Sequence, residues 1–421
     1  MATDLKEFVH SVVEANSQDL WELSRFVWEH PELAFSEVQC HDWLTDFLER
    51  RGFTVTRRYL LDTAFRAEFD APGGQEGPCV VLLCEYDALP DIGHACGHNL
   101  IAESSVGAAL AVVEAMKKYR DIRGKVVVLG TPAEESHCGK EPLIRKGALS
   151  GVDAAIMAHP APFDVVAIGF AATQKLIVRF KGKSAHAGAR PWEGLNALDA
   201  AVAAYVNVSV LRQQLKPTAR IHGVITEGGK SPNVIPEMTE MIFNVRALNS
   251  KELIELRRRV EACFRAAAEA TGCSVDLERK TSYMNVVHNV AIGETYRKHA
   301  RAFGVSFLDD DGKNVAPLGG ATDCGNVSYR VPAIHPLFGL RADKGSANHT
   351  RGFTAIANAV DSQQPTLLVA KVLALTALDL LRDAELLDEA KREFEALKLP
   401  PEESCKPRCN ELNQNSHVNK Q

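Results

Sequence analysis

The sequence predicts an α/β fold: a doubly wound, mostly parallel sheet interrupted by an inserted ferredoxin-like α+β domain. Three apolar segments, 80–83, 125–130 and 152–157, have the composition of buried strands, and each ends in polar residues. Helical patterns lie between them, as in sheets built from parallel strands and crossover helices. After residue 174 the order becomes strand, helix, strand, strand, helix, strand, which is the ferredoxin-like order.

Hydrophobic periodicity and turn residues predict the other elements. Helices are expected at 5–28, 36–50, 101–118, 196–213, 251–271, 288–303, 363–381 and 386–397. Further strands are expected at 53–59, 67–69, 175–180, 219–226, 238–247, 275–281 and 331–337. We therefore expect a discontinuous sheet domain of residues 1–173 and 286–399 and an inserted domain of residues 174–285. The polar, aperiodic segment 400–421 is expected to be a disordered tail.

Composition excludes several classes of protein. The 421 residues are 46% hydrophobic, which is enough for two cores, and the formal net charge is −6. Without a basic stripe we expect no nucleic-acid partner. We find no apolar run long enough to cross a bilayer and no signal-peptide pattern, so we expect no membrane partner. Ten scattered cysteines indicate reduced thiols in a cytoplasmic protein.

The segment 91–99 carries the strongest chemical signal. It contains His94, Cys96 and His98 and lies between the strand 80–83 and the helix expected from residue 101. Loops at the carboxyl ends of parallel strands are where open α/β sheets bind ligands. A Cys-x-His pair offers a thiolate and an imidazole to one metal ion. The ordinary alternative is a turn that contains these residues by chance.

Polar residues at other strand ends extend this pattern. The candidates are Cys96, His98, Glu134, Glu135, His159 and the later His349. Thiolate, imidazole and carboxylate are the ligand types of zinc sites. Five or six such ligands exceed what one tetrahedral ion needs, so the sequence favours a pair of ions.

Adjacent acidic residues, Glu134 and Glu135, follow the strand 125–130. Neighbouring side chains point in different directions, so one can bind metal while the other faces substrate. A carboxylate that is not a ligand can take a proton from the attacking water and pass it to the leaving amine. The alternative is that both residues favour a helix N-terminus after Pro132.

Four ordered motifs carry a resemblance to a known family. They are His94-Ala95-Cys96-Gly97-His98, Pro132-Ala133-Glu134-Glu135, Met157-Ala158-His159-Pro160 and Ser184-Ala185-His186-Ala187-Gly188. In order and spacing the chain resembles the aminoacylase-1/carnosinase-like metallopeptidases over about residues 15–385. It matches their amidohydrolase branch, which also holds aminobenzoyl-glutamate and auxin-conjugate hydrolases. Within that branch it looks most like the dipeptidases that act on β-alanyl-lysine and Xaa-Arg.

The resemblance implies a role for each matching residue. Two divalent ions, zinc first and manganese or cobalt otherwise, would be held by Cys96, His98, Glu135, His159 and His349. Glu134 would be the general acid/base. The inserted domain would make a homodimer, and its His186 would reach the partner's active site and stabilise the oxyanion; alternatively His186 is an exposed loop residue.

Substrate-binding residues are also implied. Asn233 and Arg246 match positions that hold the substrate carboxylate, for which the planar fork of arginine is suited. Arg246 is otherwise a surface charge on a strand. Gly319 and Gly320 would let the backbone approach the substrate, or form an ordinary turn. Asn99 departs from the family, where Asp is common, and leaves metal choice open.

The expected function is metal-dependent hydrolysis of a dipeptide with a basic C-terminal residue. Acidic candidates for the basic side chain are Asp323, Glu227 and the run 309–311. The first alternative is an N-acyl-amino-acid or aminobenzoyl-glutamate amidohydrolase, although no basic cluster for an acidic substrate lies near the motifs. The second is a non-catalytic scaffold, against which the complete ligand set argues.

Overall fold

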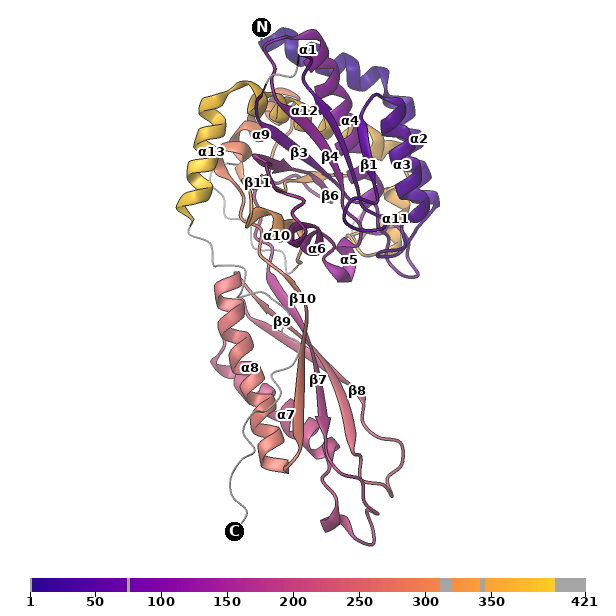
Figure 1. The fold of residues 1–421 in the computed structure, drawn as a ribbon, viewed down its shortest axis with the longest axis vertical. Coiled ribbons are helices and arrows are strands. Elements are labelled where there is room, and N and C mark those ends of the chain that lie inside the picture. The colour runs from indigo at the N-terminus through magenta and orange to yellow at the C-terminus, as the bar shows by residue number, and fades with distance from the viewer. Residues whose placement is uncertain (1, 74–75, 311–319, 341–344, 398–421) are drawn as a thin grey trace. The chain divides into compact units, whose positions relative to one another are not determined.

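The computed structural model describes residues 2–73, 76–310, 320–340 and 345–397, which form two compact units (Figure 1). Unit 1 holds the described residues of Met1–Gly169, Val286–Leu318 and Thr322–Leu399. Unit 2 holds Phe170–Asn285 together with Gly320 and Ala321. The segment 174–285 lies inside unit 2. The predicted tail, 400–421, lies outside the described residues.

A six-stranded mixed sheet forms the centre of unit 1, in the order β1-β2-β4-β3-β5-β11. Its strands are β1 (Thr54–Arg57), β2 (Phe65–Asp70), β3 (Cys79–Cys84), β4 (Lys125–Gly130), β5 (Ala154–Ile156) and β11 (Ala333–Ile334). The last four are parallel to one another, whereas β2 runs antiparallel to both of its neighbours. The predicted α/β class with a mostly parallel sheet is confirmed, and the antiparallel strand makes the sheet mixed.

Both faces of this sheet are covered. Every residue of β3 is buried, and its side chains alternate between two apolar clusters. Val80 and Leu82 pack with helices on one face, while Val81 and Leu83 pack with residues from the other face. A strand buried on both sides needs a continuous apolar sequence, which explains why β3 and β4 were recognisable without alternation.

The helices of unit 1 surround the sheet. They are α1 (Ala2–Ala15), α2 (Ser17–Glu29), α3 (Val38–Arg50), α4 (His98–Lys118), α5 (Glu134–His137), α6 (Lys140–Arg145), α9 (Val290–Ala302), α10 (Cys324–Ser328), α11 (Arg351–Ile356), α12 (Val360–Arg382) and α13 (Ala384–Ala396). The predicted single helix 5–28 is wrong, because α1 and α2 are separate helices. Asn16 lies between them, and its side-chain amide donates to Val12 O at 2.8 Å, a local bond that competes with helix continuation.

Two helices, α4 and α12, are long and apolar enough to span a membrane by length and composition. The expectation that no segment reaches that length is therefore wrong. However, 94% of the apolar window of α4 and 78% of that of α12 are buried inside the protein. Both helices pack into the core of unit 1, where their side chains join one apolar cluster.

Unit 2 has the predicted ferredoxin-like arrangement. Its elements are β7 (Ala172–Lys181), α7 (Ala197–Leu211), β8 (Arg220–Glu227), β9 (Met238–Ala247), α8 (Ser250–Thr271) and β10 (Ser274–Tyr283). The antiparallel strands have the order β10-β7-β9-β8, and α7 and α8 cover one face (Figure 1). The side chains of Asn196 and Asn249 cap the two helices by accepting backbone N–H groups.

A second, two-stranded parallel sheet lies in unit 1 and was not predicted. It pairs β6 (His159–Ala161) with β12 (Leu337–Gly339), and His159 is opposite Leu337. The expected strand 331–337 is instead two short strands, β11 and β12, with Pro336 between them. Proline lacks the backbone N–H that a continuous ladder needs, so the chain leaves one sheet before joining the next.

Candidate metal centre

Cys96 and His98 lie where β3 passes through a loop into α4. Gly97 separates them in a left-handed conformation, with φ of +81°. A Cβ at this position would lie 2.6 Å from Cγ of Pro160, so the close approach of the two segments requires glycine. His98 is the first residue of α4 rather than a loop residue, and it is fully buried.

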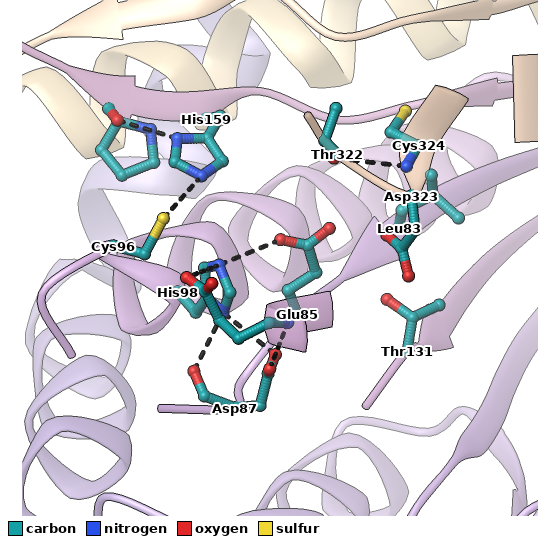
Figure 2. Close-up of polar contacts among 12 residues, drawn as sticks. Leu83, Glu85, Asp87, Cys96, His98, Thr131, His159, Thr322, Asp323 and Cys324 are labelled. Atoms are coloured by element: carbon teal, nitrogen blue, oxygen red, sulfur yellow. Dashed lines mark hydrogen bonds and ion pairs between the residues drawn. The ribbon is translucent and has the colours of Figure 1, made fainter. Parts of the chain in front are cut away.

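The imidazole of His98 is oriented by Asp87, at the carboxyl end of β3 (Figure 2). Its Nδ1 donates to Asp87 O at 2.9 Å and to Asp87 Oδ1 at 3.0 Å. The Nε2 atom is therefore available to bind a metal ion. Asp87 Oδ2 accepts the N–H of Glu135 at 2.9 Å. One carboxylate thus fixes a histidine ring and the backbone of a second predicted ligand.

Glu134 and Glu135 begin the short helix α5. Ala133 precedes them with φ of +61°, a conformation that costs free energy for a residue with a Cβ. The turn is held by Glu37, whose Oε1 accepts the N–H of Ala133 at 2.9 Å. Glu37 Oε2 also accepts the hydroxyl of Thr63 at 2.8 Å. These bonds keep both acidic residues at the end of β4.

His159 and His349 complete the cluster from two further segments. His159 Nδ1 donates to Pro160 O at 2.8 Å, which leaves Nε2 free to face Cys96 Sγ at 3.3 Å (Figure 2). His349 Nε2 lies 3.1 Å from Glu135 Oε1. His349 itself has φ of +67°, and its N–H donates to Ala95 O.

The structure brings all five predicted ligands together. Three overlapping groups have ligand atoms within 4.8 Å of one another: Cys96, His98 and His159; Cys96, Glu135 and His349; His98, Glu134 and Glu135. The atoms His98 Nε2 and Glu85 Oε2 are buried and make no hydrogen bond within the described part of the chain. Buried polar atoms without partners are rare, so their convergence fits a site that binds cations.

The electrostatics of the cluster also fit a cation. Burial, and then the charge of Glu135, raises the pKa of the Cys96 thiol well above its ordinary value. Burial lowers the pKa of His159 to about 4, so this ring is neutral. Burial, and then the carboxylates of Glu135 and Glu85, raise the pKa of Glu134 well above its ordinary value. A positive charge among these atoms would stabilise the thiolate and carboxylates, which are the metal-binding forms.

Comparisons with known proteins agree with this geometry. The chain is 45% identical to the Xaa-Arg dipeptidase of Mus musculus over 399 residues, which cover 93% of this chain and 92% of the relative. This chain belongs to the M20 peptidase family. The family model of a peptidase dimerisation domain matches residues 172–272 of this M20 peptidase. It is also 29% identical to one of the p-aminobenzoyl-glutamate hydrolase subunits of Escherichia coli, over 93% of this chain and 95% of the relative.

Solved structures show the same fold. The putative aminohydrolase of methicillin-resistant Staphylococcus aureus has a TM-score of 0.76 and 20% identity, covering 89% of this chain and all of that one. A Bacillus subtilis protein described as a dinuclear metal-binding peptidase of the M20 family has a TM-score of 0.68 and 20% identity, covering 87% and 99%. The predicted metallopeptidase fold with an inserted domain is confirmed.

A buried ion cluster adjoins the metal centre of this M20 peptidase. The ammonium of Lys140 lies 2.5 Å from Glu85 Oε1 and 2.5 Å from Asp323 Oδ1, and all three side chains are buried. Burial lowers the pKa of Lys140, but Asp323 and Glu85 raise it well above its ordinary value, so the group is cationic. Glu85 and Asp87 also follow a buried strand, as Glu134 does, but they were not among the predicted site residues.

Asn99 does not face the metal centre. Its amide donates to Ser24 Oγ at 3.0 Å and to Ala357 O at 2.8 Å, and the side chain is fully buried in the packing of α4. These bonds hold Asn99 in the packing of the helix rather than against a predicted metal ligand. Asp87 is the residue that orients the ring of His98.

Most acidic candidates for a basic substrate side chain are engaged elsewhere. Asp323 is buried and paired with Lys140. Asp309 accepts the N–H groups of Val166 and Ala167 and pairs with Arg297. Asp310 pairs with Arg297 and Arg301, and residue 311 lies outside the described residues. The carboxylates of these three residues, Asp309, Asp310 and Asp323, are therefore engaged in ion pairs within the protein and do not fit the predicted role of binding a basic substrate side chain.

The remaining candidate is Glu227, at the end of β8 in unit 2. Its Oε1 accepts the N–H of Gly229 at 3.3 Å. The carboxylate is partly exposed, so it keeps surface available for a cationic partner. Among the acidic candidates that lie in the described residues, Glu227 is the one that keeps a partly exposed carboxylate without an ion-pair partner there.

The predicted residues of the inserted domain fall into two groups. His186 and Asn233 are adjacent, because Ala187 N donates to Asn233 O at 3.0 Å and His186 pairs with Val234. Arg246 lies opposite Thr173, near the start of β7, whereas His186 follows the end of β7. The ten residues of β7 span about 30 Å and separate the position of Arg246 from that of His186. The two residues of one chain therefore do not come together within unit 2.

The glycine pair of the predicted substrate loop is only partly described. Gly319 lies outside the described residues. Gly320 is exposed, and its carbonyl accepts the N–H of Ala171 at 2.9 Å. A Cβ at Gly320 would meet no atom within 4 Å, so no close approach within the described part of this chain requires glycine there.

Proposed function

We propose that this protein hydrolyses the amide bond of dipeptides with a basic C-terminal residue. Support comes from the convergence of Cys96, His98, Glu135, His159 and His349, with the buried Glu134 beside them. Further support is the 45% identity to an Xaa-Arg dipeptidase over almost the whole chain. The single observation that carries the proposal is this convergence of metal-ligand atoms at one end of the sheet.

The five converging residues would hold two divalent ions. Bound ions supply Lewis acidity, which polarises the amide carbonyl and acidifies water. We propose zinc as the native metal, because thiolate and imidazole ligands favour it, with manganese or cobalt as alternatives. We also propose a cytoplasmic location, which the eight free cysteines of the described residues support.

Glu134 would move the protons of the reaction. Its carboxylate takes a proton from the attacking water and delivers that proton to the nitrogen of the leaving amine. Burial keeps bulk water from competing for this proton, and it raises the pKa of the group towards the value that a proton donor needs. Glu135 remains oriented during these steps by the bond from its N–H to Asp87.

A panel of three substrates tests the specificity. β-Alanyl-lysine, β-alanyl-norleucine and Nα-acetyl-lysine differ in the basic side chain or in the free amine. We expect the highest kcat/KM for β-alanyl-lysine, and Glu134→Gln should lower its kcat at least about a hundredfold while bound metal is retained. A clear preference for Nα-acetyl-lysine would contradict the dipeptidase proposal and favour the amidohydrolase alternative. Full activity of Glu134→Gln would contradict the role of Glu134.

We further propose a homodimer in which His186 serves the partner's site. The match of residues 172–272 to a dimerisation domain supports this, as do the exposed apolar residues Val206 and Val210 on α7. The separation of His186 from Arg246 within unit 2 also supports it, since His186 would not reach a substrate held by Arg246 of the same chain.

Subunit exchange tests this arrangement. Glu134→Gln and His186→Ala proteins are each expected to be nearly inactive. After exchange, the heterodimer has one site with both residues intact, so an equal mixture should recover about a quarter of wild-type activity. An exchanged mixture without recovered activity would argue that His186 acts within its own chain.

A further inference from the structure

Glu85 has an unusual environment beside the metal centre. It follows the last residue of β3, and its side chain is fully buried. One oxygen, Oε1, accepts from the ammonium of Lys140 at 2.5 Å. The other, Oε2, accepts no hydrogen bond from the described residues, and its contact there is an ion pair of 3.4 Å with His98 Nε2 (Figure 2). A separation of 3.4 Å is long for a hydrogen bond, and a buried carboxylate oxygen rarely lacks one, so this atom has room for a closer cation.

The separation of Glu85 from His98 matches that of two ligands on one ion. Glu85 Oε2 lies 3.4 Å from His98 Nε2. Nitrogen and oxygen ligands bound tetrahedrally to one zinc ion, at their usual bond lengths, are about 3.4 Å apart. His98 Nε2 is also the ring atom that the bonds from Nδ1 to Asp87 leave available. The two atoms therefore face the same volume at a ligand-to-ligand distance.

Charge balance points to the same conclusion. Lys140 is a single buried cation between two buried carboxylates, Glu85 and Asp323. The three groups carry an excess of one negative charge if both carboxylates are ionised. Leaving a buried charge uncompensated is unfavourable. His98 Nε2 faces Glu85 Oε2 at 3.4 Å, and a metal ion bound by both atoms would place the balancing positive charge between them.

We propose that Glu85 is a further ligand of the metal centre and binds, through Oε2, the same ion as His98 Nε2. Lys140 holds the carboxylate so that a single oxygen reaches the ion. This inference rests on the proposed two-ion centre. It makes the two ion positions different: Glu85 adds a carboxylate to the group that contains His98, Cys96 and His159, whereas Cys96, Glu135 and His349 form the other group without it.

Titration of the metal-free protein with cobalt tests the proposal without measuring activity. Glu85→Gln keeps an oxygen for Lys140 but presents an amide nitrogen, which does not bind metal, to His98. The matched control is Asp323→Asn, which removes the same charge from the other side of Lys140. In Glu85→Gln we expect one ion to bind normally and the other about tenfold or more weakly, with an altered visible cobalt spectrum. Asp323→Asn should keep both affinities and the wild-type spectrum.

The outcomes separate this inference from the proposed function. Wild-type protein that binds fewer than two ions would contradict the two-ion centre itself. Two normal ions and an unchanged spectrum in folded Glu85→Gln would overturn the role of Glu85 alone, as would an equal loss in Asp323→Asn. If Glu85→Gln does not fold, Glu85→Asp serves instead. It retains the charge beside Lys140 but withdraws the oxygen from the ion, so it should also lose the second ion; wild-type affinity in Glu85→Asp would overturn the proposal.

Discussion

Asp87 and Glu37 act at the scale of single residues, because each carboxylate joins segments that are far apart in the sequence. Asp87 connects the ring of His98 to the backbone of Glu135. Glu37 accepts the N–H of Ala133, which lies 96 residues later in the chain, and stabilises its positive φ. Asp87 was predictable in principle, since it follows a buried strand. Glu37 was not, because no periodicity or spacing links it to the turn that it holds.

Glu37 also makes stability depend on pH. Burial, opposed by the bond from Thr63, raises the pKa of Glu37 from 4.5 to about 7. The native protein therefore retains a proton that the unfolded chain has lost between these values, so this group lowers stability as pH rises from about 4.5 to 7. The full effect is about 3 kcal/mol, from the size of the shift.

The Glu37→Gln variant should remove this dependence, because glutamine resembles the protonated carboxyl group and does not titrate. Urea unfolding of the metal-free proteins at pH 5 and pH 8 measures the difference. We expect Glu37→Gln to gain up to about 3 kcal/mol relative to wild type between the two conditions. If wild type and Glu37→Gln differ in unfolding free energy by the same amount at both pH values, Glu37 does not titrate in this way.

At the scale of elements, strand ends predicted the site better than the elements that surround it. The polar residues after β3 and β4 were recognisable because both strands are continuous apolar segments. The start of α4 was placed three residues late, since Gly97 and His98 give no helical pattern. The strands β6 and β12 are three residues each, too short for periodicity, and they form only because the two segments meet in the fold.

The junction of β3 and α4 depends on Gly97. Alanine there combines a positive φ with a Cβ contact of 2.6 Å to Pro160. Gly304 is the matched control, because it has φ of +87° and a Cβ added there would meet no atom within 4 Å. We expect Gly97→Ala to cost about 3 kcal/mol and to reduce bound metal, and Gly304→Ala to cost about 1 kcal/mol with metal unchanged. Thermal unfolding measures the loss of stability, and metal analysis measures the bound metal. Equal effects of the two substitutions would contradict the claim that the close approach of Pro160 requires glycine at position 97.

At the scale of the whole molecule, the sequence was sufficient for the architecture but not for the buried charges. The inserted ferredoxin-like unit was predictable because its strand and helix patterns are long and amphipathic. The cluster of Glu85, Lys140 and Asp323 was not, because its members are 55 and 183 residues apart and each is of a type usually found on the surface. Asp323 was accordingly interpreted as a substrate contact, although it is paired with Lys140 in the interior.

The central claim is that side chains from four segments hold two ions at one end of the central sheet. X-ray diffraction from crystals of zinc-loaded protein, recorded on both sides of the zinc absorption edge, tests it most directly. We expect two anomalous peaks among Cys96, His98, Glu135, His159 and His349, with Glu134 beside them and bound to neither ion. A single peak, or peaks away from these residues, would contradict the account.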